Sequence, residues 1–149
     1  THNVGGIVAA AEALRITEIE RSSEVARIGA LRDKLFAGLL AIEGAHRTIP
    51  AETSVPGVVH VCLQGIESES LLYLLDEADV CASAASACAS GAMEPSHVLA
   101  AMGLTPDLTM GALRLSLGHT TTVEDIDRAI VAITDAVTRI RAVQNRRSL

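Results

Sequence analysis

The chain has 149 residues, a net charge of −6 at neutral pH, 49% hydrophobic residues and 20% charged residues. This length suits one domain, and the composition is typical of a globular protein rather than a disordered one. The negative charge and the single lysine, Lys34, argue against nucleic-acid binding, which depends on clustered basic side chains. No apolar run reaches the length of a membrane span, so the sequence predicts no membrane partner.

The three cysteines, Cys62, Cys81 and Cys88, do not form the pattern of a disulfide framework. In an apolar chain without a secretory leader they favour a reducing cytoplasm. Cys81, Cys88 and His97 lack the compact spacing of a zinc site, so no metal centre is expected. The chain starts at Thr1 without Met and runs almost at once into a helical pattern, which we interpret as the start of an excised fragment.

The first third of the sequence predicts helix. Small and apolar residues from Val4 to Thr17 indicate a helix that begins near Asn3. An amphipathic helix is then expected to end at Gly44, with Lys34 as a solvated residue beside its apolar stripe. The stripe consists of apolar residues three or four apart: Val25, Ile28, Leu31, Leu35, Leu39 and Ile42.

The remaining sequence alternates between strand and helix patterns. Strands are predicted at 58–63, near Val80 and at 112–117, and helices at 68–78 and 95–102. A final long helix is expected after a capping box of Thr121 and Glu124. Its buried stripe is Val123, Ile126, Ile130, Ile133, Val137 and Ile140. Together these elements predict an α/β fold in which a small sheet is flanked by long helices on one face.

Cys88 lies in a segment, 84–92, in which every neighbour is small. Such a segment loses more entropy on ordering than burial of its side chains can recover, so the sequence predicts a mobile loop whose thiol can reach a partner. A linker that happens to contain a cysteine is the alternative, and composition alone does not decide between them. Cys62 and Cys81 lie in or beside apolar strands, so both are predicted to be buried and inert.

Arg114 interrupts an otherwise apolar strand pattern, Leu113-Arg114-Leu115-Ser116-Leu117. Because a buried arginine is rare unless it is paired, two roles are open. The guanidinium either holds a structural carboxylate such as Glu94 or presents its fork to the carboxylate of a substrate.

The segment Ser86-Ala87-Cys88-Ala89-Ser90-Gly91-Ala92-Met93-Glu94-Pro95-Ser96-His97-Val98-Leu99, followed by Ala101-Met102-Gly103-Leu104, resembles the catalytic-loop signature of cysteine desulfurases. The similarity is to the group with a long catalytic loop that serves nitrogen fixation and iron–sulfur cluster assembly. Arg114-Leu115-Ser116-Leu117-Gly118 and the acidic helix start after it continue the resemblance, as does the beginning of the chain at Thr1-His2-Asn3-Val4.

The resemblance implies the aspartate-aminotransferase-like (type I) fold of class V pyridoxal-phosphate enzymes. Residues 1–149 would be the small C-terminal domain plus the interdomain helix that enters it, and the large cofactor-binding domain would lie outside the chain. The implied reaction converts L-cysteine to L-alanine and an enzyme persulfide, which passes to a sulfur-acceptor or scaffold protein. A cytoplasmic homodimer is implied as well.

The resemblance also implies roles for three residues of this sequence. Cys88 corresponds to the nucleophile that becomes the persulfide, and Arg114 to the arginine that binds the substrate carboxylate. Thr1 corresponds to a threonine that reaches the cofactor phosphate of the neighbouring subunit. The lysine that binds pyridoxal 5′-phosphate covalently would lie outside this chain, so these residues alone are expected to be inactive.

Two other functions remain open at this point. One is a persulfide carrier or binding module without catalysis, which the absence of a cofactor lysine would fit and a retained Arg114 would not. The other is an enzyme similar to selenocysteine lyase, which shares the fold.

Overall fold

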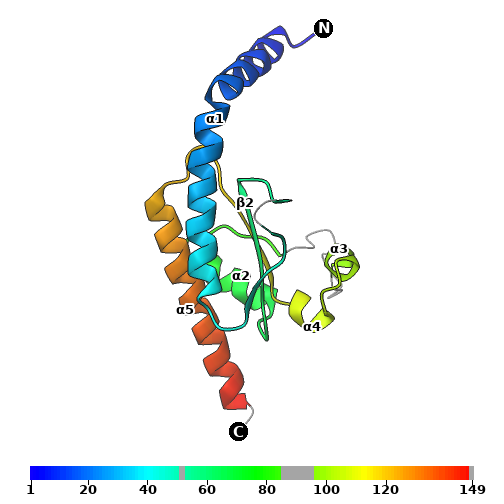
Figure 1. Ribbon diagram of the computed structural model, residues 1–149, viewed down its shortest axis with the longest axis vertical. Coiled ribbons are helices and arrows are strands. Elements are labelled where there is room, and N and C mark those ends of the chain that lie inside the picture. Colours follow the sequence, from blue (N-terminus) through cyan, green and yellow to red (C-terminus); the bar gives the residue numbers. More distant parts are fainter. Residues whose placement is uncertain (51–52, 85–95, 148–149) are drawn as a thin grey trace.

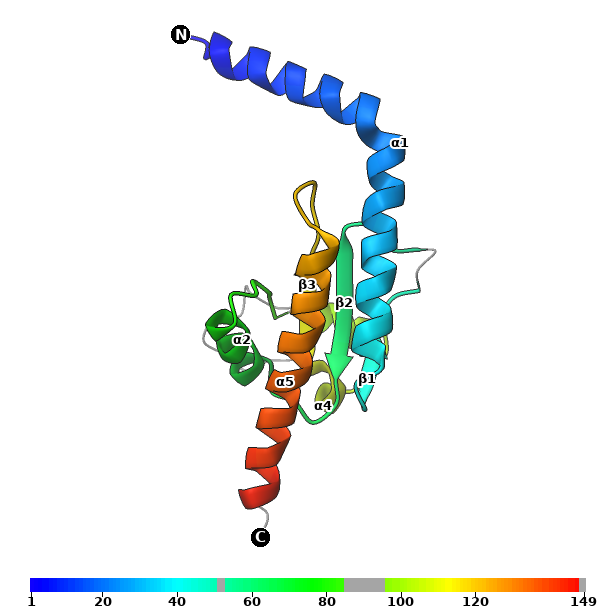
Figure 2. The ribbon, with the colours of Figure 1, turned by 90° about the vertical axis from the view of Figure 1, so that its left-hand side faces the viewer.

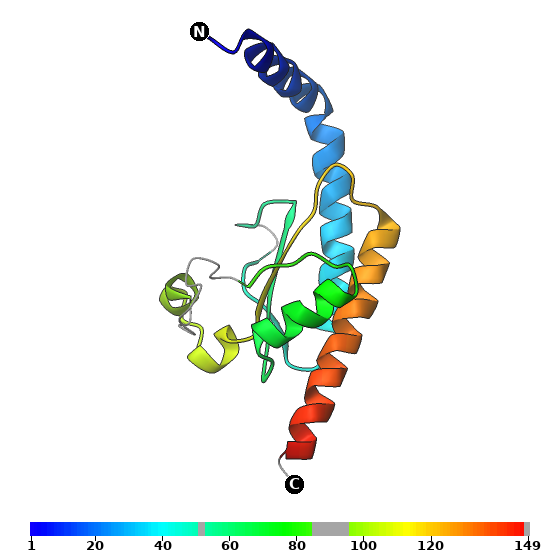
Figure 3. The same cartoon turned by 180° about the vertical axis from the view of Figure 1, so that it is seen from behind.

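The computed structural model describes residues 1–50, 53–84 and 96–147, and in it a small antiparallel sheet packs against two long helices. The strand order is β1-β2-β3. Helices α1 and α5 lie side by side over one face of the sheet, whereas α3 and α4 lie on the other side (Figures 1 and 3). The elements in chain order are α1 (Val4–Leu40), β1 (Ala45–Arg47), β2 (Val58–Leu63), α2 (Ser68–Glu77), α3 (His97–Ala101), α4 (Pro106–Thr109), β3 (Ala112–Ser116) and α5 (Val123–Arg147).

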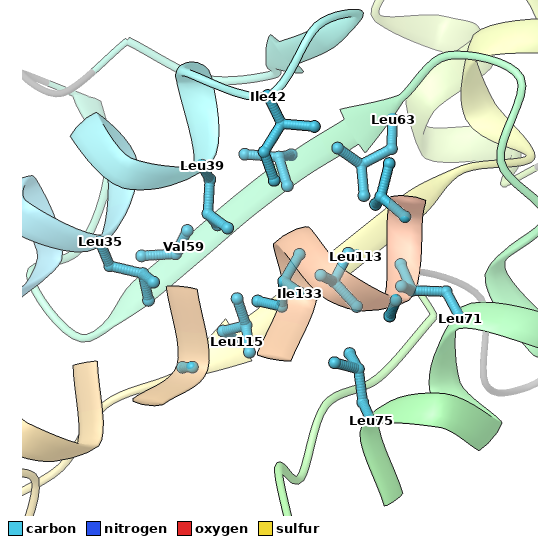
Figure 4. Packing of buried hydrophobic residues seen from close by; sticks show 14 of the residues in the cluster. Leu35, Leu39, Ile42, Val59, Leu63, Leu71, Leu75, Leu113, Leu115 and Ile133 are labelled. Atoms are coloured by element: carbon cyan, nitrogen blue, oxygen red, sulfur yellow. The ribbon is translucent and has the colours of Figure 1, made fainter. Parts of the chain in front are cut away.

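The core lies between the sheet and the helical layer (Figure 4). Alternate residues of the two longer strands point into it, because successive side chains of a strand face opposite sides of the sheet. The strands contribute Val59, Val61, Leu63, Leu113 and Leu115, all buried. Helices α1, α2 and α5 complete the cluster with residues that include Leu35, Leu39, Leu71, Leu75 and Ile133. The predicted α/β fold with long helices on one face of a small sheet is therefore confirmed.

The other face of the sheet, called the outer face below, carries the intervening residues of β2 and β3. The register pairs Cys62 with Ala112 and His60 with Arg114. One end of this face is covered, since Leu99 of α3 packs on Cys62 and Ala112 in a second apolar cluster. Arg114, two residues further along β3, is exposed.

Helix α1 begins as the sequence predicts and ends earlier. The side chain of Asn3 caps it by accepting a hydrogen bond from the Gly6 N–H at 3.0 Å. The last helical residue is Leu40, and Gly44, expected to end the helix, instead forms the turn into β1 with φ +71°. This conformation favours glycine.

The two predicted helical stretches of the first third form one continuous helix, and only its second half packs on the core. Leu31, Leu35, Phe36 and Leu39 are its buried residues, whereas Val25 of the predicted stripe is 48% exposed. The N-terminal half projects beyond the sheet (Figure 2). It carries a series of exposed apolar side chains: Val4, Ile7, Val8, Leu14, Ile16 and Ile19.

Several local predictions need correction. The expected strand near Val80 is a single isolated bridge between Ser83 and Arg114. The capping box of α5 is one residue further on than predicted: the Asp125 N–H donates to Thr122 Oγ1, and the Thr122 N–H donates to Asp125 Oδ2. Strand β1 and helix α4, of three and four residues, were not predicted, because such short segments carry no periodicity.

The packing of α5 predicts a clear difference between two of its residues. Ile133 is fully buried, whereas Val131 is 60% exposed. Ile133→Ala should lower the free energy of unfolding by about 2–5 kcal/mol, because it removes apolar contacts and leaves a cavity. Val131→Ala on the same helix should change it by less than about 0.5 kcal/mol. Urea unfolding of both variants measures the difference, and equal losses would contradict the described orientation of α5.

Candidate functional site

A row of polar residues crosses the outer face of the sheet at the level of Arg114. His60 of β2 is the register partner of Arg114, and Thr48, just after β1, contacts His60. On the other side of Arg114, Ser83 pairs with it through the isolated bridge. Four segments that are far apart in the sequence therefore meet in one row, Thr48–His60–Arg114–Ser83.

Arg114 is exposed on this face, so its guanidinium does not need the buried partner that an apolar strand would otherwise require. The reason is the alternation of β3: Leu113 and Leu115 fill the core, and the residue between them must point outward. Within the described part of the chain, no carboxylate forms an ion pair with Arg114. Glu94, the proposed structural partner, lies outside the described residues. The exposed guanidinium of Arg114 suits the binding of an external carboxylate.

The backbone of Arg114 is fixed on the side away from β2. The Arg114 N–H donates to the Ser83 carbonyl at 2.8 Å, and the Ser83 N–H donates to the Arg114 carbonyl at 3.0 Å. This reciprocal pair is a short extension of the antiparallel ladder. It holds the chain segment just before residue 85 against the strand that carries Arg114.

His60 is half-buried beside Arg114, and no pattern in the sequence marked it as a site residue. Its Nδ1 lies 2.8 Å from Thr48 Oγ1. Burial lowers the pKa of His60 below its ordinary value, and the positive charge of Arg114 lowers it further. The ring is therefore neutral at neutral pH. It also forms part of the wall of a hollow of about 230 Å³, together with Phe36, Ile49, Val55 and Val58.

The three cysteines differ. Cys62 is fully buried, as predicted, and burial raises the pKa of its thiol to about 11. Cys81 is exposed, so the prediction that it is buried is wrong. Cys81 lies between α2 and the isolated bridge at Ser83, outside the named strands that the sequence pattern had suggested would bury it. Cys88 lies outside the described residues. Over residues 1–50, 53–84 and 96–147, no cluster of three potential metal ligands occurs.

Thr1 and Lys34 lie away from the polar row. Thr1 precedes the projecting end of α1, far from the sheet (Figure 2), so the chain itself does not bring Thr1 and Arg114 together. Lys34 is partly exposed and forms an ion pair with Asp127 of α5 at 2.7 Å. Its prediction as a surface residue is confirmed, with the addition that it links the two long helices.

A second polar cluster joins α1 to the loop after β3. Arg27 donates hydrogen bonds to the carbonyls of Thr121 and His119, at 2.7 and 2.9 Å. The same guanidinium holds the pKa of Glu24 at about 2, and His119, 3.0 Å from Glu24, contributes in the same direction. These contacts fasten the loop to α1 near the point where the helix leaves the core, so we assign them a structural role.

Comparison with known proteins identifies the family. The model of the aminotransferase class-V family matches residues 1–129. The chain therefore belongs to the aminotransferase class-V family. No helix within the described part of the chain is both long and apolar enough to cross a bilayer.

Individual relatives place the similarity more narrowly. The chain is 40% identical over 141 residues to cysteine desulfurase IscS of Shewanella baltica, and 42% identical over 141 residues to that of Aeromonas hydrophila. Each match covers 95% of this chain and 34% of the relative, so the chain spans about a third of the length of these proteins. A solved NifS-like protein superposes with a TM-score of 0.79 at 33% identity, covering 93% of this chain and 34% of the other.

The family implies pyridoxal phosphate, and the residues of this chain do not by themselves fit that cofactor. Covalent binding of the cofactor requires a lysine amine. Lys34 is the only lysine of the sequence, and its amine is already engaged by Asp127. It also lies on the helical layer, whereas Arg114 lies on the outer face. The cofactor's attachment point is not provided by these 149 residues.

The contrast between Cys62 and Cys81 can be measured directly. On exposure of the native chain to iodoacetamide at pH 8, Cys81 should be alkylated within minutes, whereas Cys62 should react only after unfolding, because the thiolate is the reactive form and burial disfavours it. Peptide mass spectrometry reports both sites. Rapid modification of Cys62 in the native chain would contradict the packing of α3 on the sheet.

Proposed function

We propose that this chain is the C-terminal, thiol-bearing part of a cysteine desulfurase. The reaction removes sulfur from L-cysteine, leaves L-alanine and places the sulfur on Cys88 as a persulfide. The observation that carries the proposal is the exposed guanidinium of Arg114 on the outer face, fastened through Ser83 to the segment that leads to Cys88. The identity with IscS relatives supports the same reaction.

The covalent chain limits how far the Cys88 thiol can lie from Arg114. Cys88 follows Ser83 by five positions. Because an extended chain spans at most about 3.6 Å per residue, the Cα atom of Cys88 lies no more than about 18 Å from that of Ser83. Ser83 is itself paired with Arg114. The chain between Ser83 and Cys88 is therefore long enough for the thiol to reach a substrate whose carboxylate is held by Arg114.

In this proposal the two residues have separate tasks. Arg114 binds the carboxylate of L-cysteine through two parallel N–H···O hydrogen bonds, which fix the orientation of the substrate. The Cys88 thiolate then attacks the substrate sulfur, so that a sulfur–sulfur bond forms as the carbon–sulfur bond breaks. The electron pair left on carbon is taken up outside this chain. A thiol with a pKa near 8.5 is only partly ionised at neutral pH, so removal of its proton is part of the step.

We assign the cofactor-binding groups that these residues do not supply to the rest of the class-V fold. We place the pyridoxal phosphate and its lysine there, with Thr1 contributing to the cofactor phosphate of a neighbouring subunit in a homodimer. The exposed apolar side chains on the N-terminal half of α1 support this arrangement, since a subunit interface would remove such side chains from water. We propose a cytoplasmic enzyme that passes the persulfide sulfur to an acceptor protein.

A persulfide carrier without catalysis is the second candidate. The engagement of the only lysine by Asp127 favours it. The exposed Arg114 argues against it, because a carrier has no need to bind an amino-acid carboxylate. The enzyme and the carrier differ in one product: only the desulfurase releases L-alanine.

The proposal predicts the site of sulfur transfer. The protein, assembled with the rest of the class-V fold and pyridoxal phosphate, is incubated with L-cysteine under non-reducing conditions and mapped by peptide mass spectrometry. Cys88 should gain one sulfur atom, removable by dithiothreitol, and L-alanine should accumulate.

Two variants serve as controls for this experiment. Cys88→Ala should abolish both products, whereas Cys81→Ala, at an exposed cysteine beyond the polar row, should leave both unchanged. Alanine release with an unmodified Cys88 would assign the nucleophile to another thiol. A persulfide acquired from a donor without any alanine release would favour the carrier.

A further inference from the structure

The ladder between β2 and β3 places His60 and Arg114 in close contact across the sheet. The Leu63 N–H donates to the Gly111 carbonyl at 2.9 Å, and the Leu117 N–H donates to the Gly57 carbonyl at 2.8 Å. These pairs fix which positions of the antiparallel ladder are hydrogen-bonded. Because hydrogen-bonded and non-hydrogen-bonded pairs alternate, His60 and Arg114 form a non-hydrogen-bonded pair.

Pairs of this type bring their side chains closest. Directly opposite residues have Cβ atoms about 4.5–5.5 Å apart, at the short end for non-hydrogen-bonded pairs. The backbone of Arg114 agrees with the assignment, since both its N–H and its carbonyl bond to Ser83 on the side away from His60. The imidazole is therefore the nearest side chain across the strand from the guanidinium, on the face where Arg114 is exposed.

Thr48 fixes the His60 ring from its other side. Its hydroxyl lies 2.8 Å from Nδ1 and 3.2 Å from the His60 carbonyl, to which it donates. A threonine hydroxyl has a single proton. When that proton is given to the carbonyl, Nδ1 of the neutral ring is the donor to Thr48 Oγ1, and Nε2 keeps its lone pair. This lone pair is an acceptor available to an N–H of the neighbouring guanidinium.

We propose that His60 is a positioning residue for Arg114, which limits the guanidinium to orientations that present its fork to the substrate carboxylate. The inference rests on the proposed role of Arg114. An unrestrained arginine loses considerable rotamer entropy when it binds, and a neighbour that restricts it beforehand reduces that loss. A neutral imidazole can do so without adding a second positive charge beside the first.

Three variants separate positioning from a merely structural role. His60→Leu removes both ring nitrogens, and His60→Gln restores a carbonyl oxygen at about the reach of Nε2. His46→Leu is the matched control, because His46 is exposed on the same face but is the register partner of Cys62. In the protein assembled with the rest of the class-V fold, KM and kcat for L-cysteine are measured for each.

The expected result is a split between the two kinetic constants. His60→Leu should raise KM about tenfold with kcat within about twofold, His60→Gln should recover most of the loss, and His46→Leu should match the unsubstituted protein. An unchanged KM in His60→Leu would overturn the inference. A parallel fall of kcat and stability in both His60 variants would assign the ring a structural role and would also overturn it.

A measurement without turnover keeps the inference separate from the proposed function. Side-chain ¹⁵N relaxation of the Arg114 Nε–Hε group, assigned with Arg114→Lys, reports how restricted the guanidinium is. It should be more ordered in the unsubstituted chain than in His60→Leu. If L-cysteine is not turned over, the proposed function fails while this difference still supports positioning. Equal order in both proteins would overturn the positioning role whatever the activity.

Discussion

The alternation of β2 and β3 is the constraint on which the rest of the structure depends. Val59, Val61, Leu113 and Leu115 must lie on the helical side, since each fully buried side chain of this size contributes about 1.5–3 kcal/mol. A slip of one residue in β3 would expose two leucines and bury Arg114. The cost of an unpaired buried charge adds several kcal/mol. The same requirement that builds the core therefore places Arg114 on the outer face beside His60.

The two faces of the sheet consequently have different tasks. The helical face is apolar and is closed by α1, α2 and α5. The outer face is covered by α3 at one end only, where Cys62 is shielded and its thiol is kept protonated. At the level of Arg114 the face carries polar groups supplied by Thr48, His60 and Ser83. The polar row is thus a consequence of strand order and register. Because it lies on the face away from the core, a reactive residue on an adjoining loop can act beside it without disturbing the core packing.

Much of the fold could be predicted from the sequence, because its long helices and β-branched strand have clear periodicity. The stripe from Leu31 to Leu39 and the strand 58–63 appear where they were predicted. Periodicity did not reveal that Val25 would be exposed, since it reports amphipathicity and not what covers the surface. Periodicity could not predict β1 or α4, because segments of three and four residues are too short to show a repeating pattern.

The candidate site could be predicted only in part. Arg114 was identified from its residue type within an apolar strand, but its exposure was not. His60 was overlooked, although the alternation of strand 58–63 already implied that it points to the face of the sheet opposite to that of Val59 and Val61. What the sequence lacked was the register, which decides that His60 meets Arg114 and that Thr48 meets His60. Register depends on contacts between separate segments of the chain, and the local sequence pattern of one strand does not contain it.

The central claim, that the register pairs His60 with Arg114 on the outer face, is tested most directly by nuclear Overhauser contacts between backbone α-protons. In antiparallel sheets the α-protons of non-hydrogen-bonded pairs face each other, because their Cα atoms are only about 4.5 Å apart. The structure predicts a strong contact between the α-protons of His60 and Arg114, and another between those of Cys62 and Ala112. A contact from His60 to Leu113 or Leu115 instead would mean a shifted register, and it would contradict the positions assigned to the core and to the polar row alike.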